Sequence, residues 1–73
     1  MYLDDAALAV FSKWLVSCGA EILKTTSVWE VLRVRAKGQT LVAYRNAEGR
    51  QTWPRALADM YKLRACGHQP QLG

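Results

Sequence analysis

The sequence predicts a two-layer α+β fold: a three-stranded antiparallel meander with both helices on one face. Residues 28–53 hold three β-like runs, separated by turns around Gly38 and Gly49. An apolar run rich in helix formers precedes these strands, and a second one follows them. The order helix, strand, strand, strand, helix is typical of a single sheet covered by a layer of helices.

The first helix is predicted over residues 5–18. Asp4 or Asp5 is a natural N-cap, and Gly19 stands where a left-handed C-cap is expected. Its apolar residues exceed what one face of a small sheet requires, and they are Ala7, Leu8, Val10, Phe11, Trp14, Leu15, Val16 and Cys18. Because excess apolar surface usually marks an interface, we predict a homodimer through this helix, with Leu8, Val10 and Trp14 at the contact.

The second helix is predicted over residues 54–66. Pro54 suits the first position of a helix, because its missing N–H has no partner there, and Gly67 ends the run. Residues 68–73, with the sequence HQPQLG, have nothing to bury. They are therefore predicted to form a flexible tail after a single α+β domain of residues 1–67.

The connection between the first helix and the strands spans residues 20–27. Ile22 and Leu23 are apolar and are expected to enter the core. Residues 25–27, with the sequence TTS, are predicted to be a loop or a short strand.

Side chains alternate along a strand, so the meander has one apolar face toward the helices and one uncovered face. The apolar face is predicted to contain Val28, Leu32, Val34, Ala36, Leu41, Ala43 and Trp53. The uncovered face is predicted to contain Trp29, Val31, Arg33, Arg35, Val42, Tyr44, Arg50 and Thr52. Glu30 and Arg45 also fall on the apolar side, where they are predicted to pair with each other across two strands. Phe11, Leu15 and Met60 complete the predicted core.

Length and charge limit the classes of function. A chain of 73 residues is one small domain, which buries only about 60% of its unfolded surface and is marginally stable unless it associates. Hydrophobic residues make up 51% of the chain, which excludes a disordered protein. The net charge of +4 and the pI of about 9.4 favour acidic partners such as nucleic acids.

The uncovered face is the predicted functional surface. Arg33, Arg35 and Arg50 supply charge for phosphates, while Trp29 and Tyr44 supply flat rings on which bases stack. This combination predicts a non-enzymatic binding protein that contacts DNA or RNA. In a second interpretation the face is only solvated, and its arginines cover the two rings through cation–π contacts.

A third interpretation is a protein-interaction or assembly module that binds no nucleic acid. The excess apolar surface of the first helix favours it, with a second copy or another protein as the partner. The small size of the chain also suggests an accessory protein of a phage or another mobile element that binds a host protein.

Parts for an enzyme or a cofactor site are scarce in the chain. The single histidine, His68, lies in the predicted tail, and the acidic residues and glycines are dispersed. Cys18 and Cys66 lack metal-ligand spacing and are predicted to be reduced thiols. We therefore predict no enzymatic activity, no metal and no cofactor. The acidic start of the chain and the lack of an apolar run of about 20 residues predict a cytoplasmic protein without a membrane partner.

The order of elements resembles that of the double-stranded RNA-binding domain. That family carries a lysine-rich start to its second helix. Here residues 53–57 read WPRAL, with Arg55 as the one basic residue. The order of elements alone does not place the chain in that family.

Overall fold

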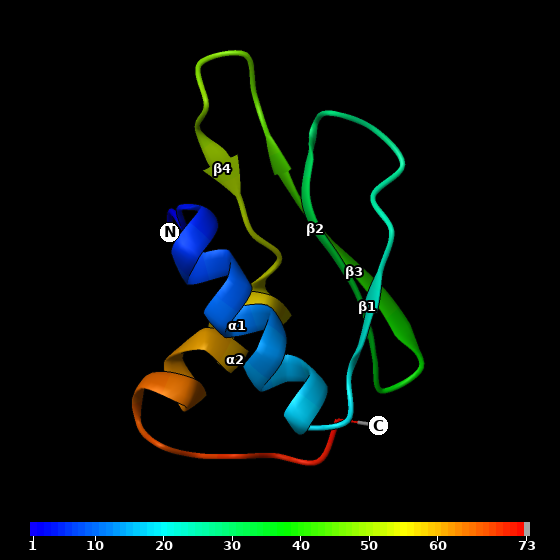
Figure 1. The fold of residues 1–73 in the computed structure, drawn as a ribbon, viewed down its shortest axis with the longest axis vertical. Helices are drawn as coiled ribbons and strands as arrows, with labels where there is room; N and C mark the ends of the chain where they lie inside the picture. Colours follow the sequence, from blue (N-terminus) through cyan, green and yellow to red (C-terminus); the bar gives the residue numbers. More distant parts are fainter. Residues whose placement is uncertain (73) are drawn as a thin grey trace.

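The computed structural model describes residues 1–72, in which four strands form one antiparallel sheet with both helices on the same side (Figure 1). The elements in chain order are α1 (Asp5–Ser17), β1 (Glu21–Leu23), β2 (Glu30–Ala36), β3 (Gln39–Arg45), β4 (Gln51–Thr52) and α2 (Arg55–Ala65). The strands follow one another in the sheet as β1-β2-β3-β4. The predicted α+β class is confirmed, with four strands where three were expected. The additional strand, β1, lies in the connection, earlier than the short strand considered for residues 25–27.

Local signals place both helices close to the predicted bounds. The Asp4 carboxylate accepts a hydrogen bond of 2.8 Å from the Ala7 N–H, which caps α1. Gly19 ends that helix with a φ of 99°, a conformation that favours glycine. At 13 and 11 residues, neither α1 nor α2, the two helices within residues 1–72, is long and apolar enough to cross a membrane.

The core lies between the sheet and the helices, with Phe11 at its centre. The Phe11 ring lies 6.0 Å from the Trp14 ring, 6.2 Å from the Trp53 ring and 5.2 Å from the Tyr61 ring, between centroids. The fully buried side chains of the strands and helices that surround it include Leu15, Val34, Ala43 and Leu57. The predicted core residues belong to this cluster or pack against it, except Val28 and Leu23. Ile22 packs against the core as expected, whereas Leu23 pairs with Arg33 and lies on the other side of the sheet.

The two ends of the chain close the core. The Gln51 side chain accepts a hydrogen bond of 2.9 Å from the Leu3 N–H and donates one of 3.0 Å to the Leu3 carbonyl, and Leu3 is buried. At the other end, the Leu72 N–H donates to the Cys18 carbonyl at 2.7 Å, and the Leu72 carbonyl accepts from the Lys37 N–H at 2.9 Å. The buried Leu72 side chain contradicts the expectation that residues 68–72 bury nothing.

Strand register sets which side chains share a face. Ala36 pairs with Gln39 around a two-residue turn, in which Lys37 and Gly38 have φ values of 53° and 75°. Positive φ at both positions is the geometry of a type I′ hairpin, and it gives the alternation that the sequence predicted for this end of the strands. Further along β2 the register shifts between Glu30 and Leu32, so that one residue is inserted.

Candidate nucleic-acid interface

The side of the sheet opposite the helices, which we call the open face, carries arginines, acids and one exposed ring. Strand pairing assigns to it Glu21, Leu23, Glu30, Arg33, Arg35, Thr40, Val42, Tyr44, Arg50 and Thr52. Of the five residues predicted to contact nucleic acid, four lie on this face. They are Arg33, Arg35, Tyr44 and Arg50.

The β-bulge at Val31 moves several side chains from their predicted positions. Tyr44 lies opposite Glu30, and the next pair is Ala43 with Leu32, so Val31 has no partner of its own. Val31 packs against the core instead of lying on the uncovered face. Glu30 comes onto the same side as Arg33. Val28, predicted to be in the core, lies before the strand and is 69% exposed.

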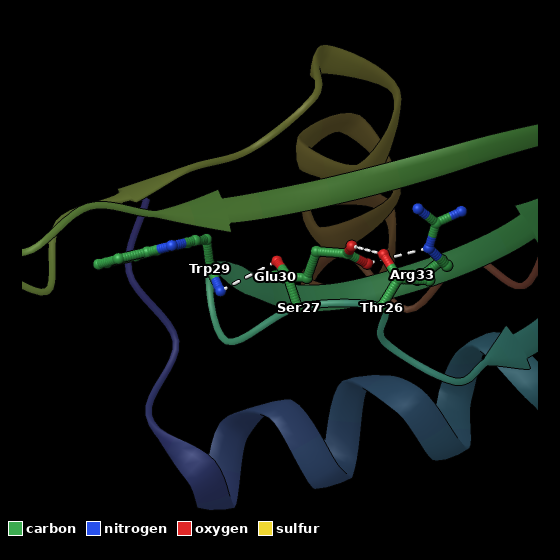
Figure 2. Close-up of polar contacts among 5 residues, drawn as sticks. All are labelled: Thr26, Ser27, Trp29, Glu30 and Arg33. Atoms are coloured by element: carbon green, nitrogen blue, oxygen red, sulfur yellow. Dashed lines mark hydrogen bonds and ion pairs between the residues drawn. The ribbon is translucent and has the colours of Figure 1, made fainter.

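Glu30 forms an ion pair with Arg33, not with Arg45 as predicted. The Arg33 Nε donates to Glu30 Oε1 at 2.9 Å, and the Thr26 hydroxyl donates to the other carboxylate oxygen (Figure 2). These hydrogen bonds, that from Arg33 first, lower the pKa of Glu30 from 4.5 to about 2, against the opposing effect of burial. Arg45 instead donates from its Nε to the Val28 carbonyl at 2.7 Å.

Trp29 lies apart from the arginines with which it was predicted to share a face. It stands in the turn before β2, with its carbonyl accepting from the Arg45 N–H at 2.8 Å. Trp29 is 51% exposed, and its ring extends away from the Glu30–Arg33 pair (Figure 2). The predicted platform of two rings is therefore reduced to Tyr44.

Tyr44 lies within the open face, between Glu30 on β2 and Thr52 on β4. The residue is 48% exposed. The second interpretation requires arginines over Trp29 and Tyr44, but within residues 1–72 the cation–π contact is Arg64 over Tyr61, at 5.9 Å. The Tyr44 ring is therefore free of an arginine cover.

Charge on the open face is more balanced than the sequence suggested. The Glu30–Arg33 pair neutralises one arginine, and strand β1 places Glu21 directly opposite Arg35. Residues 20–52 nevertheless carry six of the ten Lys and Arg side chains and three of the six acids. Three of the four net positive charges of the protein therefore belong to the sheet segment.

The apolar residues of α1 do not form one external patch. Leu8 and Trp14 are half-buried and pack against the core, while Val10 is half-exposed. Val10 and Trp14 are neighbours four residues apart, but Leu8 lies about 200° around the helix from Val10. The homodimer through α1 stays a prediction. Of the three predicted contact residues, Val10 and Trp14 lie beside each other and could share one contact, whereas Leu8 lies on another side of the helix.

The helix side of the sheet has an apolar hollow of about 270 Å³. It is lined by Ala36, Lys37, Gln39, Leu41, Ala56, Asp59, Met60, Leu63, Pro70 and Leu72. Its charged groups are one lysine and one aspartate, and they do not make a catalytic set. Within residues 1–72 no group of three or more His, Cys, Asp or Glu side chains is placed to hold a metal ion.

Comparison of the chain with known protein families, curated proteins and solved structures found no match. No site residue is therefore transferred from a relative. What the open face binds is inferred from its geometry and its charges.

Proposed function

We propose that the protein is a small non-enzymatic binding module whose open face contacts a single-stranded nucleic acid. The observation that carries this proposal is Tyr44, an exposed ring on an uncovered sheet face with Arg33 and Arg50 on either side along the strands. Single-strand binding surfaces combine positive charge for the backbone with aromatic rings for the bases. A base stacks on a ring regardless of its identity, so one such ring supports binding to many sequences.

The spacing of the arginines suits a chain of phosphates. Residues two apart on a strand and on the same face are about 6.5 to 7 Å apart, so Arg35, Arg33, Tyr44 and Arg50 occupy four successive rows over about 20 Å. Within residues 1–72, Arg35 and Arg50 are the arginines of this row without an ion pair, and two neutralised phosphates give a salt slope of about −1.4 for a single strand. Stacking on Tyr44 adds about 1 to 3 kcal/mol for one base.

Titration of labelled oligonucleotides at two salt concentrations tests the proposal. Single-stranded DNA, single-stranded RNA and a duplex are compared by fluorescence anisotropy. We expect the single strands to bind more tightly than the duplex, and the affinity to fall as salt rises. No binding at low salt with tens of micromolar protein would overturn the proposal.

A pair of charge variants locates the contact. Arg50→Gln removes one charge from the open face, and Lys62→Gln removes one from the exposed side of α2. We expect Arg50→Gln to weaken binding and to reduce the salt slope by about 0.7, while Lys62→Gln leaves both unchanged. Equal effects of the two variants would show that only the net charge matters.

A cytoplasmic location belongs to this proposal. Both cysteines are free, Cys18 buried and Cys66 exposed, and free thiols persist in a reducing compartment. Nucleic acids are accessible there. We expect Cys66 to form an intermolecular disulfide when the protein is purified in air. We expect this disulfide to be absent from cell extracts in which thiols are blocked at lysis.

Association through α1 is the second candidate function, favoured by the half-exposed Val10 beside Trp14. In this case light scattering gives a mass of twice 8.2 kDa at micromolar concentration. Val10→Ser then returns the mass to that of one chain, whereas Val16→Ser on another side of the helix does not. A mass of one chain over a hundredfold dilution series would exclude this candidate.

A further inference from the structure

The guanidinium of Arg33 is held from one side only. Its Nε donates to Glu30 Oε1 at 2.9 Å, and the Glu30 side chain is only 4% exposed. The Thr26 hydroxyl holds the other oxygen of this carboxylate (Figure 2). A charged hydrogen bond to a buried carboxylate, whose other oxygen is itself hydrogen-bonded, restricts the orientation of the guanidinium more than solvent does around an exposed arginine.

The two terminal nitrogens of Arg33 remain available. No hydrogen bond within residues 1–72 joins them to the protein, and in Figure 2 they lie on the far side of the guanidinium from Glu30. The Arg33 side chain is 26% exposed, so part of it is open to solvent. Two parallel N–H donors on the planar guanidinium bind two acceptors at once.

Tyr44 is the nearest exposed ring to this pair of donors on the open face. Arg33 pairs with Val42, and Tyr44 is the next residue of β3 on the same face. Diagonal neighbours across two strands lie about 7 to 8 Å apart. A base that stacks on Tyr44 therefore has one edge within reach of the Arg33 terminal nitrogens.

We propose that Arg33 recognises a guanine stacked on Tyr44. Guanine presents two acceptors, O6 and N7, on one edge, and a bidentate arginine is the usual partner of this edge. Adenine has an amino donor in place of O6, and the pyrimidines lack N7. The proposal rests on the proposed function, since it names the base that the same surface prefers.

Single-stranded oligonucleotides that differ at one position test this preference with the wild-type protein. A thymine strand carries one central guanine, adenine, cytosine or 7-deazaguanine, in which N7 is replaced by carbon. We expect guanine to bind about 5- to 150-fold more tightly than adenine or cytosine, the range for one bidentate contact. We expect 7-deazaguanine to lose most of this advantage. Equal affinity for guanine and 7-deazaguanine would overturn the proposal.

Two matched variants assign the preference to Arg33. Arg33→Lys keeps the charge but removes the planar pair of donors, and Arg35→Lys makes the same change at an exposed arginine of the open face without a bound carboxylate. We expect Arg33→Lys to abolish the guanine preference while general binding persists, and Arg35→Lys to retain it. Thermal melting confirms that each variant is folded.

The remaining outcomes are also decisive. If Arg33→Lys weakens every oligonucleotide equally, the donors bind phosphate and the guanine proposal is overturned while the proposed function stands. If the wild-type protein binds the strands with all four central bases equally tightly, the guanine proposal is likewise overturned and the proposed function stands. Failure to bind any oligonucleotide would overturn the proposed function and, with it, this inference.

Discussion

The two ends of β2 differ in how the strand is bordered, and this difference shapes the open face. Residues 33–35 pair with β1 on one edge and with β3 on the other. Glu30 and Val31 lie where β1 has already ended, so only β3 borders them. Pairing on both edges holds the pleat regular, whereas a strand with one free edge accommodates an inserted residue. The bulge at Val31 is accordingly found at the singly bordered end.

The bulge has a chemical consequence at the open face. In a regular strand, residues three apart point to opposite sides, so Glu30 and Arg33 would not meet. The inserted residue brings both to the same side, where they form the ion pair with an N–O distance of 2.9 Å. The part of β2 that is paired on both edges, which we call the regular end, supplies Arg33 and Arg35. The part with the bulge, which we call the irregular end, supplies the Glu30 carboxylate that orients Arg33.

The largest expected effect distinguishes the two ends by stability. Leu32 is the first buried residue after the bulge, and Val28 precedes the bulge and is 69% exposed. We expect Leu32→Ala to lower the free energy of unfolding by about 2 to 5 kcal/mol, and Val28→Ala to change it by less than about 0.5 kcal/mol. Urea denaturation measures both. Similar losses for the two variants would mean that the strand is regular from Val28 onward.

The next effect compares the two exposed rings in nucleic-acid binding. Tyr44 lies on the open face, and Trp29 lies before the bulge and extends away from Arg33. We expect Tyr44→Ala to weaken binding to a single strand by about 1 to 3 kcal/mol, Tyr44→Phe to leave it nearly unchanged, and Trp29→Ala to have no effect. Anisotropy titrations at one salt concentration measure this. A loss for Trp29→Ala equal to that for Tyr44→Ala would restore the two-ring platform.

Acid sensitivity is the third expected effect, and it arises at the irregular end. The pKa of Glu30 is lowered in the folded protein to about 2, below its ordinary value of 4.5. The charged carboxylate therefore contributes stability above about pH 4.5, and this contribution is lost as the pH falls toward 2. Glu30→Gln removes the titrating group, so its stability should fall less than that of the wild type over this range. An NMR titration that places the Glu30 pKa near 4.5 would contradict the buried pair.

The smallest expected effect belongs to the regular end, at the turn between β2 and β3. Lys37 has a φ of 53° there, a left-handed conformation that asparagine adopts more readily than lysine. We expect Lys37→Asn to stabilise the protein by about 0.5 to 1 kcal/mol, which raises Tm by about 2 to 8 °C. Gly38→Ala, at a φ of 75°, serves as the opposite control and should lower Tm. A lower Tm for Lys37→Asn would mean that the Lys37 side chain stabilises the turn.

Features with local causes were predictable from the sequence. The bounds of α1 and α2 follow from the Asp4 cap, Pro54 and the glycines that end each helix, because these signals act within one or two turns. The turn at Lys37 and Gly38 sets the pairing of the regular end. The shared face of Arg33, Arg35 and Tyr44 follows from that pairing and the period of two along a strand.

Features that depend on distant parts of the chain were decided only by the tertiary structure. Strand β1 forms because the backbone of Glu21–Leu23 pairs with residues 33–35 on the outer edge of β2. Leu72 is buried because its backbone is hydrogen-bonded both to Cys18 at the end of α1 and to Lys37 in the β2–β3 turn. The alternation of residues along β2 does not determine where an extra residue is inserted, because a bulge is defined by the pairing of one strand with the next. It depends on which edges of β2 are paired. The orientation of Arg33 by Glu30, and with it the chemistry of the open face, is therefore a property of the assembled sheet.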